Sequence, residues 1–126
     1  MRTLIVLVVA LGACSKESQP PAQQEEVVAS SPAADEARQL FGTVCATCHG
    51  ADGTGNGAAS ASLDPKPRNY NDKEWQAATT DDQIRNIILL GGAGVGKSPL
   101  MPAQTQLKDK PLVVEELVKI VRGFGK

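Results

Sequence analysis

The chain has 126 residues, of which 41% are apolar and only 3% aromatic, and its formal net charge is −1. This length suits one small domain, and a domain of that size buries only about two-thirds of its unfolded surface. From residue 34 onward, eleven acidic side chains balance eleven basic ones. The chain therefore has no basic patch of the kind that binds nucleic acid. We predict a small domain with a sparse core, and no nucleic acid partner.

The amino terminus has the features of an export signal. A basic start at Arg2 precedes an apolar run over residues 4–11, which is too short to span a membrane. The run ends in residues 11–14 (LGAC), which resemble the lipobox of bacterial lipoproteins. By that resemblance, residues 1–13 are a signal peptide, cleavage falls before Cys14, and the Cys14 sulfur carries a diacylglyceryl group. The alternative is an ordinary signal peptide with an incidental cysteine.

Residues 14–33 are predicted to form a disordered tether. They are rich in Ser, Pro, Gln, Ala and Glu and show no apolar periodicity. We therefore expect an exported lipoprotein, tethered through Cys14 on the periplasmic side of a bacterial membrane. In the lipoproteins that this segment resembles, an Asp directly after the lipidated Cys goes with retention in the inner membrane. Ser15 at this position therefore slightly favours the outer membrane.

The remaining residues, 34–126, predict an all-α domain. Apolar spacing indicates helices over residues 34–44, 72–77, 80–90 and 111–122. Thr80 and Gln83 form a capping box, and Gly91 is a C-terminal stop signal. The segments between are rich in Gly and Pro, and no strand pattern occurs. The prediction is three to four helices joined by long loops.

Residues 45–49 (CATCH) match the C-x-x-C-H pattern of c-type haem attachment. Cys45 and Cys48 lie three positions apart at the end of a predicted helix, so both thiols can form thioethers with the vinyl groups of one haem. His49 can then direct its imidazole at the iron. We predict one covalent haem c, which would also complete the sparse core.

Three other chemistries use a Cys-x-x-Cys pair. A redox-active thiol pair goes with a βαβ pattern, which is absent here. A zinc site needs four ligands, and the mature chain offers one His and no second cysteine pair. The third is a structural disulfide. The His that follows directly, the export signal and a downstream Met favour haem over all three.

Residues 91–98 (GGAGVGKS) match the phosphate-binding pattern G-x-x-x-x-G-K-[ST]. A P-loop must open a helix at its Gly-Lys-Ser, where backbone amides hold the phosphate. Here Pro102 would break any helix that continued from Ser98, and no parallel strands are predicted. We expect no nucleotide binding and interpret this segment as a turn that brings residues 98–102 (SPLMP) to the haem.

Residues 34–126 resemble a class I monohaem cytochrome c. That family places a helix before C-x-x-C-H, a distal Met in a later loop, and a C-terminal helix that crosses the first. Phe41 matches a buried aromatic, Ala37 a position where Gly often allows close helix crossing, and Leu117 a family Leu, whereas Ile120 replaces an aromatic. The resemblance implies a small fold around one haem and a one-electron carrier, not an enzyme, that serves redox partner proteins.

Met101 is the predicted distal iron ligand. Beyond the signal, the chain holds one His, His49, which is already used, and one Met, Met101. Pro99 and Pro102 restrict the backbone on both sides, so less entropy is lost when the loop closes on iron. The family likewise presents its Met next to a Pro. Lys97 is the nearby alternative and would have to lose its proton to bind.

Arg68, Tyr70 and Trp75 are candidates for the edge of the haem. Buried propionates need hydrogen-bond donors, and residues of this region meet the propionates in the family. We predict such contacts for Arg68 and Trp75; alternatively, Trp75 is a core residue and Arg68 is solvated. Pro65 or Pro67 is expected to offer a backbone carbonyl to the imidazole N–H of His49.

Two other functions are compatible with one haem. A haem-based small-gas binder or sensor would keep one axial position open. A peroxidase or oxidase would need a second haem motif or a catalytic module, and the sequence shows neither. Six-coordinate low-spin iron that does not bind carbon monoxide would indicate a carrier, and five-coordinate high-spin iron a sensor.

Overall fold

The computed structural model describes residues 30–126, so Cys14, the predicted signal and most of the predicted tether lie outside the described residues. All regular secondary structure in residues 30–126 is helical. No helix of this part is both long and apolar enough to cross a bilayer. In chain order the elements are α1 (Pro32–Leu40), a π-helical turn (Phe41–Cys45), α2 (Ala46–His49), a 3-10 turn (Ala58–Ser62), α3 (Lys73–Ala78), α4 (Asp81–Gly94), a second 3-10 turn (Thr105–Leu107) and α5 (Pro111–Gly123).

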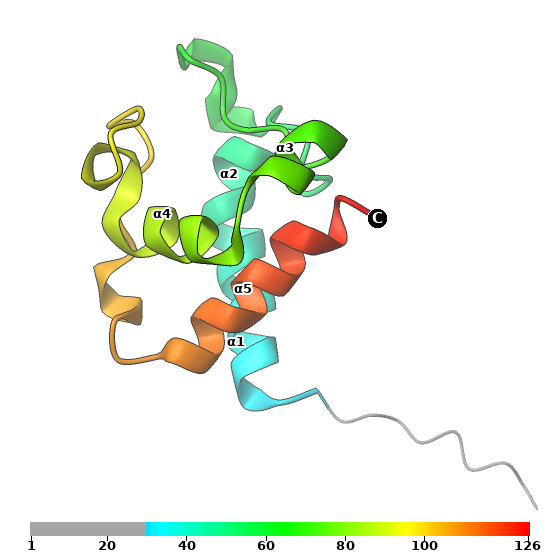
Figure 1. Ribbon diagram of the computed structural model, residues 1–126, viewed down its shortest axis with the longest axis vertical. Helices are drawn as coiled ribbons and strands as arrows, with labels where there is room; N and C mark the ends of the chain where they lie inside the picture. Colours follow the sequence, from blue (N-terminus) through cyan, green and yellow to red (C-terminus); the bar gives the residue numbers. More distant parts are fainter. Residues whose placement is uncertain (1–29) are drawn as a thin grey trace, which may run out of the picture.

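The first three elements run on without a break and form one long helix from Pro32 to His49 (Figure 1). With α3, α4 and α5 this gives four helices in the described part, which confirms the predicted all-α class. The first helix begins at Pro32 rather than at residue 34. Ser31 caps it by accepting the N–H of Ala34 at 3.2 Å, and a proline at the first helical position loses no hydrogen bond.

The first and last helices pack against each other and form the centre of the fold (Figure 1). Ala37 is completely buried in α1, and its small side chain lets a neighbouring helix approach closely. On α5, Leu117 is 1% exposed. At the other end of the contact, the rings of Phe41 and Phe124 lie 5.5 Å apart. The crossing predicted from the family resemblance is thus confirmed.

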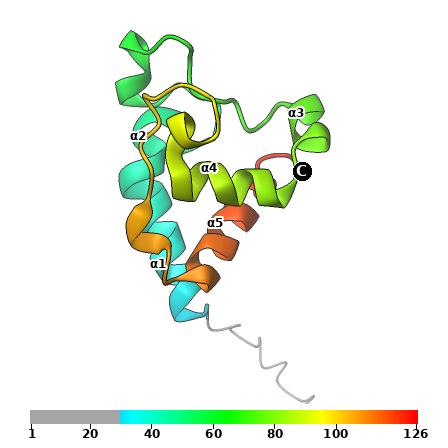
Figure 2. The same cartoon turned by 60° about the vertical axis from the view of Figure 1, so that its left-hand side comes forward.

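Helix α4 begins at the predicted capping box and ends beyond its predicted stop. Thr80 Oγ1 accepts the N–H of Gln83 at 3.2 Å, and Gln83 Oε1 accepts the N–H of Thr80 at 2.8 Å. Gly91 has φ +69° and interrupts the helix as expected, but the chain then makes a further helical turn to Gly94. Figure 2 shows the loop that follows α4 turning back beside that helix.

Candidate functional site

A cleft of about 920 Å³ is bordered by the N-terminal helix, the segment over residues 63–70, helices α3 and α4, and the loop that follows α4. This volume lies near the upper end of the range for small-molecule and cofactor sites. Its wall contains every site residue predicted within residues 30–126, namely Cys45, Cys48, His49, Arg68, Trp75 and Met101. These residues come from four separate segments of the chain, and the fold brings them together around one space.

The two cysteines lie at a change in helical geometry. Cys45 ends the π-helical turn, in which the N–H of Ala46 reaches back to the carbonyl of Phe41, and Cys48 lies in α2. Isolated π turns are frequent at functional sites. Both cysteines are free thiols, and burial raises the pKa of Cys45. Within residues 30–126, no three His, Cys, Asp or Glu side chains cluster together.

The glycine-rich loop after the motif caps α2. The N–H of Gly55 donates to the carbonyl of His49 at 2.8 Å, and the N–H of Gly57 donates to the carbonyl of Cys48 at 3.0 Å. A side chain at residue 57 would collide with the helix, because its Cβ would lie 2.4 Å from Thr47 O. The loop therefore holds the end of the helix that carries His49.

The imidazole of His49 is buried and has a defined tautomer. Its Nδ1 lies 3.1 Å from the backbone carbonyl of Arg68. A carbonyl oxygen can only accept, so Nδ1 carries the proton and Nε2 keeps a free lone pair for a metal. Burial lowers the pKa of His49, which favours the neutral ring.

The prediction that Pro65 or Pro67 supplies this carbonyl is wrong. The carbonyl of Pro67 instead faces the glycine-rich loop, where it lies 2.5 Å from the position that a Cβ of Gly55 would occupy. The next residue, Arg68, therefore presents its carbonyl to His49.

Tyr70 lies against the face of the same imidazole. The two rings are 4.5 Å apart between centroids and only 11° from parallel. Burial raises the pKa of the Tyr70 hydroxyl. The sequence associates Tyr70 with the haem edge, whereas the structure gives it a contact with His49. No local sequence pattern indicates such a contact, because Tyr70 lies far from the C-x-x-C-H motif in sequence.

Arg68 and Trp75 lie next to each other in the cleft wall. The guanidinium carbon of Arg68 is 5.8 Å from the centre of the Trp75 ring. Its Nη1 is 3.7 Å from Asp72 Oδ2, and about half of its side chain is exposed. Its charge is therefore partly balanced by Asp72 but still accessible to an anionic group at the mouth of the cleft.

The loop that carries Met101 is fixed to α4 by backbone hydrogen bonds. The N–H of Gly92 donates to the carbonyl of Met101 at 2.9 Å, and the N–H of Gln104 donates to the carbonyl of Ile88 at 2.9 Å. The N–H of Lys97 donates to the carbonyl of Gly92 at 2.7 Å. The side chain of Lys97 is exposed, and this residue also borders the cleft.

The phosphate-binding pattern at residues 91–98 does not have the structure of a P-loop. Its first four glycine-rich residues end helix α4, and Ser98 leads into turns rather than into a helix. No helix N-terminus is therefore available at Ser98 to hold a phosphate. The pattern instead allows close backbone packing, because a Cβ on Gly92 would lie 1.8 Å from Ser98 O.

The substitution Gly92→Ala should lower the free energy of unfolding by about 1–3 kcal/mol, the usual cost of overpacking, because the loop must move away from the new methyl group. Chemical denaturation measures the change. Gly123→Ala is the matched control, since a Cβ there has nothing within 4 Å, and it should be neutral or stabilising. Equal effects of the two substitutions would contradict the packing described here.

The residues that form this site match the model of one known protein family. The family model for cytochrome c matches residues 34–121, a range that includes the cleft, the C-x-x-C-H motif and Met101. No curated protein and no solved structure shows a significant match. The cleft also fits the cofactor of that family, because it combines an apolar wall with two free thiols and an imidazole whose Nε2 is free. The chain therefore belongs to the cytochrome c family, whose members bind a covalent, iron-containing haem c.

Proposed function

We propose that this protein is a one-electron carrier in which His49 and Met101 are the axial ligands of a haem attached to Cys45 and Cys48. Members of the cytochrome c family are typically electron carriers rather than enzymes. The observation that carries the proposal is that the one His of the chain and the one Met beyond its signal border the same cleft as both thiols. A haem bound there supplies an iron that alternates between Fe(II) and Fe(III).

The protein's own groups would tune that iron in three ways. The carbonyl of Arg68 holds the proton of His49 on Nδ1, and such a hydrogen bond makes the ligating nitrogen more basic. The apolar wall of the cleft disfavours the additional charge of the oxidised state, and a Met–His pair also raises the reduction potential. The apolar wall and the Met–His pair suit a carrier with a relatively high potential and unidentified donor and acceptor proteins, whereas the more basic His49 nitrogen lowers that potential.

Met101→Ala tests the distal ligand. Loss of the thioether should lower the reduction potential, remove the sulfur-to-iron charge-transfer band and let the reduced protein bind carbon monoxide. Optical spectra and a redox titration of the holoprotein measure all three. Lys97→Ala is the control and should keep the wild-type spectrum. If Met101→Ala keeps that spectrum and Lys97→Ala loses it, Lys97 is the ligand; if the wild type itself binds carbon monoxide, the protein is a gas binder.

We also propose that Arg68 and Trp75 contact the haem propionates. Both residues border the cleft, and Arg68 retains an accessible guanidinium beside the Trp75 ring. The indole N–H and the guanidinium are donors that can offset the cost of desolvating a carboxylate.

Arg68→Gln should lower the reduction potential, because a positive charge near the haem disfavours the oxidised state. It should also move the pH dependence of the potential to higher pH, since the arginine favours the ionised propionate and lowers its pKa. Lys73→Gln is the control, as it removes the same charge from an exposed residue outside the cleft wall. Redox titrations at several pH values that show no difference between the two variants would exclude the propionate role.

We further propose that the protein is exported and anchored through a lipid on Cys14, with the haem domain on the periplasmic side of a bacterial membrane. Support comes from the lipobox-like residues 11–14 and from the polar, Pro-containing segment that follows them. Several acyl chains on one cysteine would hold firmly, because each buried methylene contributes about 0.8 kcal/mol. Ser15 favours the outer membrane.

Cys14→Ser should move the protein from the membrane fraction to the soluble fraction without changing its haem spectrum. Fractionation measures the first effect, and mass spectrometry of the wild type should show a diacylglyceryl adduct on Cys14. A wild-type protein that is soluble and unmodified at Cys14 would rule out the anchor while leaving the electron-transfer proposal intact.

A further inference from the structure

The segment from Arg68 to Tyr70 contacts the imidazole of His49 on two sides. The carbonyl of Arg68 accepts the Nδ1 proton at the edge of the ring, and the Tyr70 ring covers its face at 4.5 Å. The hydrogen bond at the ring edge fixes the tautomer, and the stacked Tyr70 ring limits rotation of the imidazole out of its plane. The position of this segment therefore determines the orientation of His49.

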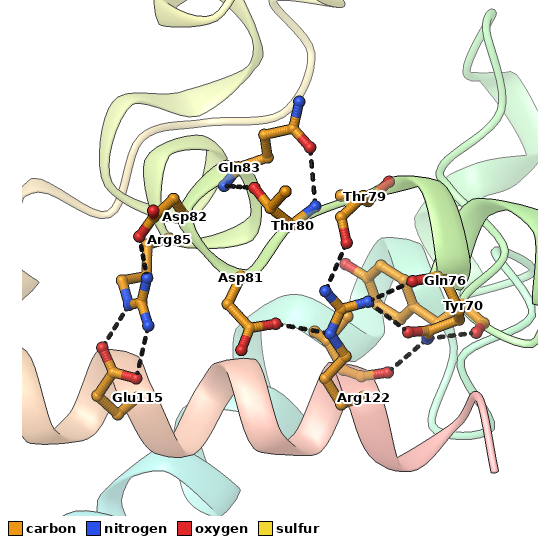
Figure 3. Close-up of polar contacts among 11 residues, drawn as sticks. Tyr70, Gln76, Thr79, Thr80, Asp81, Asp82, Gln83, Arg85, Glu115 and Arg122 are labelled. Atoms are coloured by element: carbon orange, nitrogen blue, oxygen red, sulfur yellow. Dashed lines mark hydrogen bonds and ion pairs between the residues drawn. The ribbon is translucent and has the colours of Figure 1, made fainter.

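Two hydrogen bonds hold the Tyr70 backbone. Its N–H donates to the carbonyl of Gly53 at 2.7 Å, and its carbonyl accepts from Gln76 Nε2 at 2.8 Å. The same Nε2 also donates to the carbonyl of Val121 at 2.9 Å. One side-chain amide thus links the segment beside His49 to helix α5, as Figure 3 shows.

Arg122 fixes the orientation of that amide. Its Nη1 donates to Gln76 Oε1 at 3.0 Å and to the Gln76 carbonyl at 2.8 Å. Its Nη2 donates to the carbonyl of Thr79, and its Nε donates to Asp81 Oδ1 at 2.7 Å (Figure 3). A guanidinium only donates and a carbonyl only accepts, so only one orientation of the Gln76 amide satisfies all its partners.

Gln76 and Arg122 lie outside the wall of the cleft. Neither residue therefore touches a group bound in the cleft, and the hydrogen bond from Gln76 to the Tyr70 carbonyl is their route to the segment that contacts His49. The backbone at Gly125 covers Gln76, because a Cβ on that glycine would lie 2.6 Å from Gln76 Cδ. The amide is thus held from three directions: by α5, by the guanidinium and by the carboxyl-terminal backbone.

We propose that Gln76 and Arg122 are positioning residues for the axial imidazole, acting on His49 through Tyr70 and Arg68. The inference rests on the proposed function, in which His49 ligates the haem iron. Groups that orient a metal-ligating His from outside the coordination sphere affect the metal although they do not touch it. The orientation of an axial imidazole determines how unpaired spin is distributed over a ferric haem, so the shifted proton resonances of the haem methyl groups report it directly.

Gln76→Glu tests the proposal in the holoprotein. Glutamate keeps the size of the side chain and an oxygen for Arg122, but it cannot donate to the carbonyls of Tyr70 and Val121. We expect the haem methyl resonances of the ferric protein to shift. Glutamate also adds a negative charge, which lowers the reduction potential by itself, so the methyl resonances are the deciding observable for this variant. Arg122→Lys keeps the charge but cannot replace the guanidinium fork with a single ammonium. It should shift the methyl resonances and raise the reduction potential, because a looser Arg68 carbonyl makes the His49 nitrogen less basic.

Arg85→Gln is the matched control. Arg85 also joins α4 to α5, through Glu115, and pairs with Asp82 in its own helix, but it does not contact the Arg68–Tyr70 segment (Figure 3). This variant should lower the thermal midpoint and leave the methyl resonances in place. Such a difference separates a positioning role from a general role in stability, which Arg85 and Arg122 share.

Two results would overturn the inference. One is a folded Gln76→Glu protein with wild-type methyl resonances; if that variant does not fold, wild-type methyl resonances and potential in Arg122→Lys decide. The other is a methyl shift in Arg85→Gln as large as that in the Gln76 and Arg122 variants. A wild-type holoprotein without a His-ligated haem spectrum would contradict the proposed function as well. That failure is distinguishable because it is seen in the wild type, whereas the positioning role is tested by the variants.

Discussion

The hydrogen bond between the His49 imidazole and the carbonyl of Arg68 connects the chemistry of the site to the rest of the structure. It determines which ring nitrogen is free, and it requires the chain to return to His49 after a long excursion. The glycine-rich loop makes that return possible, because its amides cap α2 and its residue 53 pairs with Tyr70. The loop, the Arg68–Tyr70 segment and the end of the first helix therefore form one unit around a single ring.

Close backbone packing replaces side-chain bulk on both sides of the cleft. Gly57 lets the loop lie on α2, and Gly92 lets the loop that carries Met101 lie on α4. These close contacts hold the end of α2 and the loop with Met101 in place beside the cleft, whose wall is formed by helical and loop residues together.

Local signals in the sequence predicted most of the architecture. The capping box at Thr80, the proline at the start of α5 and the C-x-x-C-H motif each depend on neighbours within a few positions, and the structure agrees with the expected elements. The helix start at Pro32 also has a local signal, because a serine before a proline is a strong helix cap. Residues 14–33 nevertheless have the composition of a disordered segment, so disorder is predicted there. The prediction of Met101 followed from elimination, since the chain has one His and one Met after Met1, and it agreed with the family resemblance, which also supported Trp75.

The remaining features depend on contacts between distant parts of the chain. Whether residue 65, 67 or 68 presents its carbonyl to His49 depends on how the glycine-rich loop packs, and no local pattern encodes that. The stacking of Tyr70 on His49 and the links from Gln76 to Val121 and Arg122 join separate helices. A glutamine in a short helix and an arginine near a C-terminus both resemble ordinary solvated side chains when only the sequence is considered.

The uninterrupted helix from Pro32 to His49 separates the two ends of the domain. At 1.5 Å per residue it is about 27 Å long. The described chain starts at one end of this rod, and the imidazole lies at the other (Figure 1). The preceding chain thus enters the domain far from His49. In the anchored protein that we propose, the length of the leader would set how far the domain reaches, and the rod would keep His49 about one helix length from the point of attachment.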